Sequence, residues 1–203
     1  MFERMYKMKQ GFSGNVGTLT PLYGKDGKPL YNKGLLWYRS PLFDFRAHPK
    51  NPFVYTAADG TQYKPDNHYC TDGGSIPPST RVIPFANLDP LNFPRAYLCH
   101  DCPYEYGGMY IKYPLETEFK FRLMTRRQTD AMMPDWLYYD GANWWTRRVV
   151  CTGIAAGSWP LWPDGPDTSK AVKQKCNRVK AKINVYDAWG DLIEDNGGVK
   201  LLS

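Results

Sequence analysis

The chain has 203 residues, enough for one domain with extensions, and 42% of them are hydrophobic, so it can bury a core. Its 18 glycines and 17 prolines favour a loop-rich fold over a helical bundle. The formal charge of +6 is modest and partly concentrated near the C-terminus, so charge alone does not indicate nucleic-acid binding.

The cysteine pattern and the apolar runs predict where the protein is made. No apolar run approaches the roughly 20 residues of a membrane span. Residues 1–10 mix charged and aromatic side chains and lack the apolar core of a signal peptide. The five cysteines are irregularly spaced. We therefore expect a protein made in a reducing cytoplasm, with mostly free thiols.

The first third of the chain predicts an arm followed by strands. Residues 1–34 have weak periodicity and frequent glycines, which is typical of an N-terminal arm that lies on the surface or docks on a neighbouring subunit. Short runs of aromatic and β-branched residues then predict a small antiparallel sheet. These runs are 35–38, 42–45, 53–56 and 68–71.

Prolines dominate the next segment, residues 73–93, and predict a long loop of the kind that is usually functional or docked. Pro94 fits the first position of a helix. Pro103 is expected to kink or end that helix, because proline has no N–H and its ring clashes with the preceding turn. His100 and Asp101 are thus expected in the last turn.

Two further helices are predicted. Thr125 and Gln128 have capping-box spacing, so a helix is expected to begin there and to be interrupted at Pro134. Apolar residues at helical spacing predict a third helix over residues 142–156. The fold class that follows is α+β, a small antiparallel sheet followed by two or three helices, loop-rich, with extensions at both ends.

The C-terminal part reads as a basic linker and extension. Residues 163–180 combine proline and glycine with lysines, and the alternation in 182–189 predicts one more strand. The Lys170–Lys182 region is typical of a solvated face, and its sharper interpretation is a contact with nucleic-acid phosphates or an acidic subunit. The predicted organisation is an arm over 1–34, a domain over 35–162 and an extension over 163–203.

The chemistry-bearing residues gather between Thr71 and Tyr104. An acid and a hydroxyl flank a glycine turn, and an adjacent His-Asp pair follows about 30 residues later. Adjacent helical residues diverge by about 100°, so Asp101 is expected to hold a hard cation while His100 activates water from the other side. The candidate site residues are His100, Asp101, Asp130, Ser75 and Tyr104 for catalysis, and Asp72 and Asp101 for a metal.

The order of these motifs resembles a small bacteriophage family catalogued as domain-of-unknown-function family 1353. The shared pattern is Thr-Asp-x-x-Ser-Ile-Pro, then Ala-x-x-x-His-Asp-x-x-Tyr, then Arg-x-x-x-Asp, then a helix ending Gly-x-x-x-Trp, and it covers roughly residues 35–162. The resemblance implies a phage-encoded protein and carries no settled activity. The matching residues are Thr71, Asp72, Ser75, Ile76, Pro77, Ala96, His100, Asp101, Tyr104, Arg126 or Arg127, Asp130, Arg147, Gly153, and Trp159 or Trp162.

A second, shorter resemblance covers fewer than ten residues. The run from Cys99 to Tyr104 resembles the His-Asp dyad of secreted A2-class phospholipases, Cys-Cys-x-x-His-Asp-x-Cys-Tyr with a later helical Asp. It implies a cation held by Asp101, water activated by His100 and an orienting role for Asp130. The chain lacks the usual calcium loop and the disulfide framework of that class.

Other interpretations of the same residues stay open. Structural zinc is suggested by Cys99 and Cys102 with Cys70 and a histidine, although only one Cys-x-x-Cys pair is present. Thiol redox chemistry is disfavoured, because the pair lies toward the end of the predicted helix. A serine triad lacks an elbow motif. The polar cluster can equally be a hydrogen-bonded brace for a loop-rich core.

The leading functional hypothesis is a bacteriophage virion-associated structural protein of the tail or tail-attachment region, which carries a hydrolase-like polar site. The second is a metal-dependent hydrolase, with calcium or zinc, that acts on lipid or cell wall during entry or lysis. Expected partners are other phage structural proteins in multiple copies, with nucleic acid a further partner of Lys170–Lys182. The expected location is the virion, after synthesis in the host cytoplasm.

Overall fold

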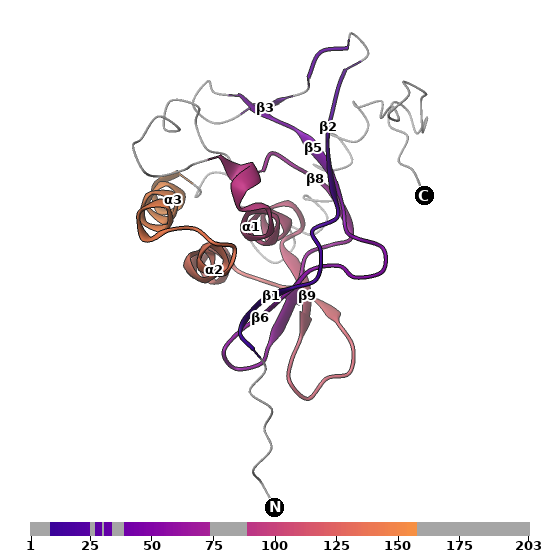
Figure 1. Ribbon diagram of the computed structural model, residues 1–203, viewed down its shortest axis with the longest axis vertical. Coiled ribbons are helices and arrows are strands. Elements are labelled where there is room, and N and C mark those ends of the chain that lie inside the picture. Colours follow the sequence, from indigo (N-terminus) through magenta and orange to yellow (C-terminus); the bar gives the residue numbers. More distant parts are fainter. Residues whose placement is uncertain (1–8, 25–26, 30, 34–38, 74–88, 158–203) are drawn as a thin grey trace, which may run out of the picture.

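The computed structural model describes residues 9–24, 27–29, 31–33, 39–73 and 89–157. Figure 1 shows the strands along one side of this part and three helices packed on the other. The predictions made for 35–38, for Ser75 and for everything after 157 lie outside the described residues. Within the described part, none of the helices has the length and apolar character needed to cross a membrane.

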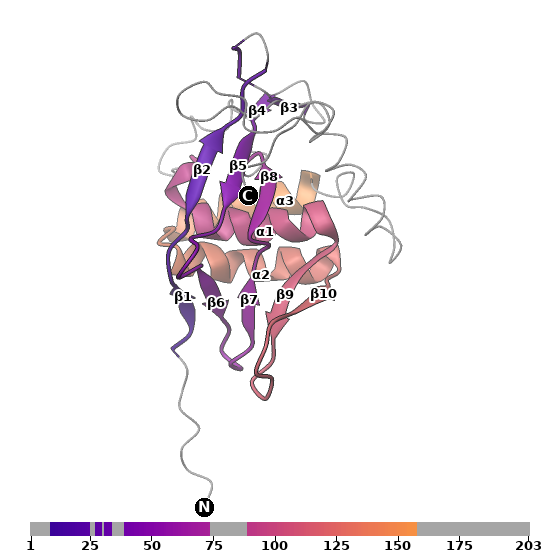
Figure 2. The same cartoon turned by 90° about the vertical axis from the view of Figure 1, so that its right-hand side faces the viewer.

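Five strands form the larger sheet, and every pairing in it is antiparallel. Figure 2 shows them side by side below the helices, with β10 at one end of the row. Two of them, β9 and β10, come from a region where the sequence patterns predicted no strand. In spatial order the strands are β1 (Gly11–Ser13), β6 (Val54–Thr56), β7 (Gln62–Lys64), β9 (Gly108–Lys112) and β10 (Lys120–Leu123).

A second antiparallel sheet has three strands in the order β2-β5-β8. The runs predicted at 42–45 and 68–71 correspond to β5 and β8. The chain therefore brings strands from within residues 1–34 into both sheets, since β1 pairs with β6 and β2 with β5. The strands are β2 (Thr18–Pro21), β5 (Phe43–Arg46) and β8 (His68–Thr71), and β3 (Tyr31–Lys33) and β4 (Arg39–Pro41) form a separate pair.

Helix α1 (Pro94–Tyr106) follows a short 3-10 turn, η2 (Pro90–Asn92). Pro94 stands at its start as predicted, and the Ala96 backbone N–H donates to the Asp140 carboxylate, because Phe93 offers no capping side chain. The expected helix end at Pro103, with His100 and Asp101 in the last turn, was wrong. The helix continues one more turn and ends at Gly107, whose backbone is left-handed at φ 72° and whose N–H donates to the Pro103 carbonyl.

Helices α2 (Arg126–Tyr139) and α3 (Trp144–Gly157) complete the fold. The capping box predicted at Thr125 and Gln128 is present, with both of its hydrogen bonds formed. The interruption expected at Pro134 was wrong, since α2 runs through it. The α1 helix packs on both sheets, α2 packs on α1, and α3 packs on α2.

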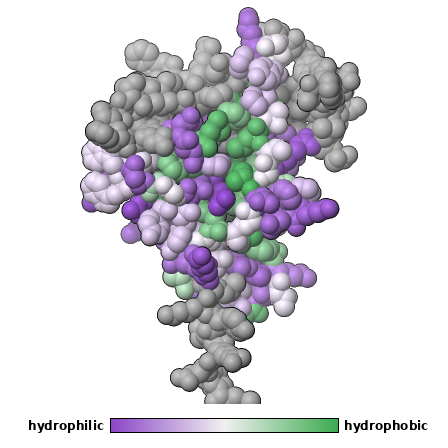
Figure 3. All heavy atoms as spheres, viewed as in Figure 1, coloured by the Kyte–Doolittle hydropathy of each residue, from purple (hydrophilic) through white to green (hydrophobic). Residues whose placement is uncertain are grey.

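Aromatic side chains fill the space between the sheets and the helices. Phe45, Tyr55 and Tyr69 from the strands are almost fully buried, as is Phe53 directly before β6, and Trp136 of α2 meets Tyr55 edge-to-face. Figure 3 shows apolar residues running down the middle of one face, with hydrophilic residues on either side. The predicted α+β class, a small set of antiparallel strands with three helices, is confirmed.

Candidate functional site

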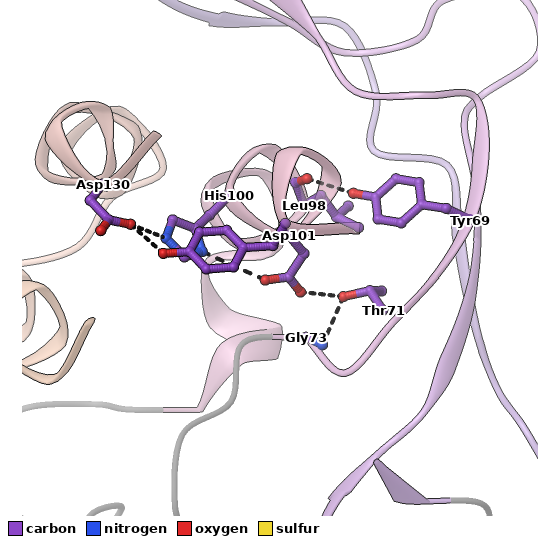
Figure 4. Close-up of polar contacts among 8 residues, drawn as sticks. Tyr69, Thr71, Gly73, Leu98, His100, Asp101 and Asp130 are labelled. Carbon is purple, nitrogen blue, oxygen red and sulfur yellow. Dashed lines mark hydrogen bonds and ion pairs between the residues drawn. The ribbon is translucent and has the colours of Figure 1, made fainter. Parts of the chain in front are cut away.

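The facing sides of α1 and α2 bring His100 and Asp130 together. His100 and Tyr104 are four residues apart on α1, so their side chains share one helix face, and their rings stack with centroids 4.5 Å apart. Asp130 follows the capped start of α2 and points at that face, as Figure 4 shows for the two labelled residues. Helix packing therefore assembles the core of the site.

Asp130 holds one edge of the imidazole. Its Oδ1 lies 3.2 Å from His100 Nε2 and accepts a hydrogen bond of 2.6 Å from the Tyr104 hydroxyl. Its Oδ2 lies 3.9 Å from Arg126 Nη1, one helical turn earlier on α2. This arrangement favours the tautomer that carries a proton on Nε2 and fixes the plane of the ring.

Asp101 lies on the other side of His100 and ties α1 to the end of β8. The Thr71 hydroxyl donates to Asp101 Oδ2, and the Gly73 backbone N–H donates to Thr71 Oγ1 over 2.9 Å. The other oxygen, Asp101 Oδ1, lies 3.7 Å from His100 Nδ1, which is too long for a direct hydrogen bond. One imidazole thus stands between two carboxylates that are anchored on different elements.

The electrostatics of the cluster favour an ion pair. Burial disfavours the charged form of His100, which is 7% exposed, but the two carboxylates outweigh it and raise the pKa of the imidazole above its ordinary 6.5. Burial likewise opposes the charged form of Asp130, yet His100, Tyr104 and Arg126 together lower the pKa of that carboxyl. At neutral pH Asp130 is therefore ionised.

Four of the five predicted catalytic residues lie together in this cluster, namely His100, Asp101, Asp130 and Tyr104. Ser75 lies outside the described residues. Asp72 is half-buried directly after β8. The site residue that sequence reasoning missed is Thr71, although it belongs to the same motif as Asp72, because a buried hydroxyl facing a carboxylate leaves no periodic signal.

The described residues offer no ready metal site. Nowhere in this part of the chain do three or more His, Cys, Asp or Glu side chains converge in a way that would hold a metal ion. Cys102 is buried between the Asp66 backbone N–H and the Gly108 carbonyl, and burial raises the pKa of both Cys99 and Cys102. Neutral thiols in those positions are core residues, which weighs against the zinc and redox interpretations.

A second His-Asp pair lies on the three-stranded sheet, and sequence reasoning missed it. Asp44 of β5 is 3% exposed; its Oδ1 lies 2.7 Å from His68 Nε2, and its Oδ2 accepts a hydrogen bond of 2.9 Å from Arg46 Nε. The antiparallel register places Arg46 opposite His68, on the same face as Asp44. Although burial works against ionisation, His68 and Arg46 lower the pKa of Asp44.

Comparisons with known proteins give this chain no relatives. No protein-family model matches it, and neither the curated proteins nor the solved structures contain a significant match. The site is therefore interpreted from its own geometry.

Proposed function

We propose that this chain is a bacteriophage virion-associated protein whose α1–α2 cluster is a hydrolytic site in which His100 activates water. The observation that carries the proposal is the placement of the imidazole: Nε2 is held by Asp130, and Nδ1 faces Asp101 across 3.7 Å. A dyad in which a carboxylate orients one ring nitrogen leaves the other for proton transfer.

The chemistry follows from that spacing. In the proposed complex, a water about 2.8 Å from both Nδ1 and Asp101 Oδ1 lies to one side of the line between these two atoms, which are 3.7 Å apart. At a pH above the raised pKa of His100, the neutral imidazole takes a proton from this water at Nδ1, and the oxygen forms a bond to the carbonyl carbon of an ester or amide. When the tetrahedral intermediate collapses, the imidazolium returns that proton to the leaving oxygen or nitrogen. Asp130 stabilises the imidazolium while it exists.

The substrate class rests on the sequence resemblances. The A2-class likeness of the Cys99–Tyr104 run implies a lipid ester. The phage-family likeness implies only a phage-encoded protein, and a lipid or cell-wall substrate met during entry or lysis is the hypothesis that fits both. The A2-class likeness also implies calcium at Asp101. The Asp101 oxygens instead face Thr71 and His100, and the described residues bring no group of three His, Cys, Asp or Glu side chains together to hold a metal ion. The proposal therefore assigns no step to a metal.

A second candidate function is purely structural. The cluster joins α1, α2 and the end of β8 through hydrogen bonds, which is what a brace in a loop-rich core requires. In this version the protein is a tail or tail-attachment component, and its C-terminal segment 163–203 contacts neighbouring subunits, whereas β1 and β2 of the expected N-terminal arm belong to the sheets of the domain. Recovery of the chain from purified particles at fixed stoichiometry would support the virion assignment in either version.

Turnover separates the two candidates. Purified full-length protein is assayed on phospholipid vesicles and on peptidoglycan, beside His100→Ala and a matched variant, His48→Ala. His48 lies outside the cluster and accepts a hydrogen bond from the Asn51 backbone N–H. The hydrolytic proposal expects a loss of about 100-fold or more in His100→Ala and none in His48→Ala.

Thermal unfolding of the same variants completes the test. If the wild-type chain cleaves neither substrate, and His100→Ala unfolds at a clearly lower temperature than His48→Ala, the hydrolytic proposal fails and the brace stands. If cleavage survives in a folded His100→Ala protein, His100 is not the base.

A further inference from the structure

Exposed aromatic side chains gather where α2 ends and α3 begins. Trp144 and Trp145 in the first turn of α3 are 60% and 43% exposed, and Tyr138 near the end of α2 is 54% exposed. The two indole rings stack with centroids 6.0 Å apart and an interplanar angle of 26°. Rings of this size are usually buried for most of their area, so a group of exposed ones indicates an interaction surface.

Two arginines belong to the same surface. The Arg147 guanidinium lies over the Tyr138 ring, 4.9 Å from its centroid, and the Arg148 guanidinium lies over the Trp144 ring at 5.5 Å. Arg148 is exposed and Arg147 is partly buried. The aromatic-arginine surface therefore consists of three rings and two cations, namely Tyr138, Trp144, Trp145, Arg147 and Arg148.

The exposed side of α3 carries no negative charge. Of the 14 residues of this helix only Arg147 and Arg148 are charged, and its other exposed positions beyond the tryptophans are Thr152, Gly153 and Ala155. Among the described elements α3 packs mainly on α2, and Figure 1 shows it as the outermost helix. A helix whose outer side meets only water normally carries charged and polar residues there. The composition of α3 instead suits a neighbour that is partly apolar and partly anionic.

The charges of the two helices support an anionic neighbour. Helix α2 carries two arginines and two aspartates, which balance, whereas α3 carries two arginines and no acid. The pair of helices therefore has a net charge of +2, and this excess lies on the helix that has the exposed indole rings. Arginine binds phosphate groups well, because its planar guanidinium can donate two parallel hydrogen bonds.

Two kinds of phosphate-rich partner fit tryptophan and arginine, and the geometry favours a membrane over a single-stranded nucleic acid. Base stacking needs open ring faces and a track of cations along the strand. A guanidinium already lies over the rings of Tyr138 and Trp144, and the exposed side of α3 has only Arg148 as an exposed cation. At a membrane interface, by contrast, indole and phenol rings lie at the level of the lipid headgroups, next to cations that contact the phosphates.

We propose that the aromatic-arginine surface docks on an anionic phospholipid membrane. The indole rings of Trp144 and Trp145 enter the headgroup layer, the small exposed side chains of α3 lie against it, and Arg147 and Arg148 bind lipid phosphates. This binding goes beyond the proposed hydrolysis and does not depend on it, because the hydrolytic residues lie between α1 and α2.

Cosedimentation of the full-length protein with vesicles tests the surface. The vesicles consist of phosphatidylglycerol or of phosphatidylcholine, both with ether-linked chains, so that no ester is present and binding is measured without turnover. The wild-type chain is expected to bind the anionic vesicles about tenfold or more tightly than the neutral ones, because each arginine near an anionic surface adds favourable energy. Added salt is expected to reduce this difference.

Substitutions locate the binding surface. Trp144→Ala combined with Trp145→Ala is expected to weaken binding by about tenfold or more, because the apolar contact is lost. Phe121→Ala is the matched control: it removes an aromatic side chain that is 42% exposed on β10, and it is expected to bind like the wild type. Arg148→Glu is expected to weaken binding to the anionic vesicles by about tenfold, whereas the same change at the exposed Lys120 of β10 is expected to alter it by less than about threefold.

The possible results decide the proposal. It is overturned if the wild-type chain binds neither kind of vesicle, if the double tryptophan variant still binds, or if Phe121→Ala weakens binding equally. Binding of a single-stranded oligonucleotide in place of vesicles also overturns it and assigns the surface to nucleic acid. Circular dichroism checks the fold of each variant, and if the tryptophan variant does not fold, Arg148→Glu must weaken binding and Arg148→Lys must retain it. A negative result does not affect the hydrolytic proposal, because these lipids contain no ester to cleave.

Discussion

Two of the three histidines of this chain pair with aspartates, and the two pairs differ in which group is shared. His68 and Asp44 meet across neighbouring strands of one sheet, where a single carboxylate serves an imidazole and the Arg46 guanidinium. His100 meets Asp130 across two helices, where a single imidazole stands between two carboxylates. The first cluster gathers an imidazole and a guanidinium around one carboxylate, and the second gathers two carboxylates around one imidazole.

On the hydrolytic proposal, this contrast separates a structural ion cluster from a reactive one. Both Asp44 oxygens are engaged at 2.9 Å or less by donors from the same sheet, so the group is fully used by the fold. In the helical cluster, Nδ1 of His100 lies 3.7 Å from its facing oxygen. On the hydrolytic proposal, Nδ1 is therefore available to a water that approaches beside Asp101, whereas both Asp44 oxygens already have close partners.

The largest expected effect is on the sheet cluster. Asp44→Ala leaves His68 and Arg46 without their shared carboxylate, and we expect a loss of about 3 kcal/mol of unfolding free energy in urea titrations at pH 7. Asp135→Ala, which removes an exposed carboxylate of α2, is the control and is expected to change stability by less than about 0.5 kcal/mol. Equal effects of the two substitutions would contradict the assignment of Asp44 as the centre of a buried cluster.

A smaller effect is expected at the helical cluster. Asp130→Asn keeps the shape of the side chain but removes the charge that faces His100 Nε2, so we expect a loss of about 1–2 kcal/mol. The pKa of His100, followed by NMR of its ring protons, is expected to fall relative to the wild type, because one of the two carboxylates that raise it is gone. An unchanged His100 titration in a folded variant would show that Asp130 does not hold the imidazole.

The smallest expected effect is a difference in pH dependence between the clusters. The raised pKa of folded His100 adds stability that is fully present below the ordinary imidazole value of 6.5 and is lost as the pH rises through the folded value. The lowered pKa values of Asp44 and Asp130 add stability that is present above 3.8 and is lost as the pH falls through their folded values. His100→Gln should therefore flatten the dependence of the unfolding free energy on pH on the alkaline side. The dependence on the acid side that Asp44 contributes should remain. Urea titrations at several pH values check both expectations.

Local chemistry predicted the ends of the helices but not their continuity. Pro94 and the Thr125–Gln128 capping box mark helix starts because they act within one turn of the chain. The prolines at 103 and 134 were expected to interrupt their helices, yet α1 and α2 pass through both. Packing on the core outweighs the hydrogen bond that each proline removes, and Pro103 itself is fully buried.

The strands likewise divide into those that local sequence predicted and those that only pairing in the sheet produced. Aromatic and β-branched runs indicated β5, β6 and β8, because those side chains fit a buried pleated surface. The β9–β10 hairpin was missed because its residues carry mixed lysine and aromatic side chains, and only pairing with β7 makes β9 an interior strand. The exposed edge of β10 therefore became visible only in the structure.

The sequence by itself determined which residues are candidates for a site, since His100, Asp101, Tyr104 and Asp130 stand out by type and spacing. Tertiary structure alone decided how they meet. The packing of α2 on α1 selected the ring nitrogen that Asp130 holds, and the end of β8 supplied Thr71 to hold Asp101. Contacts between residues 24 to 30 positions apart depend on how separate elements pack, and no local pattern encodes that.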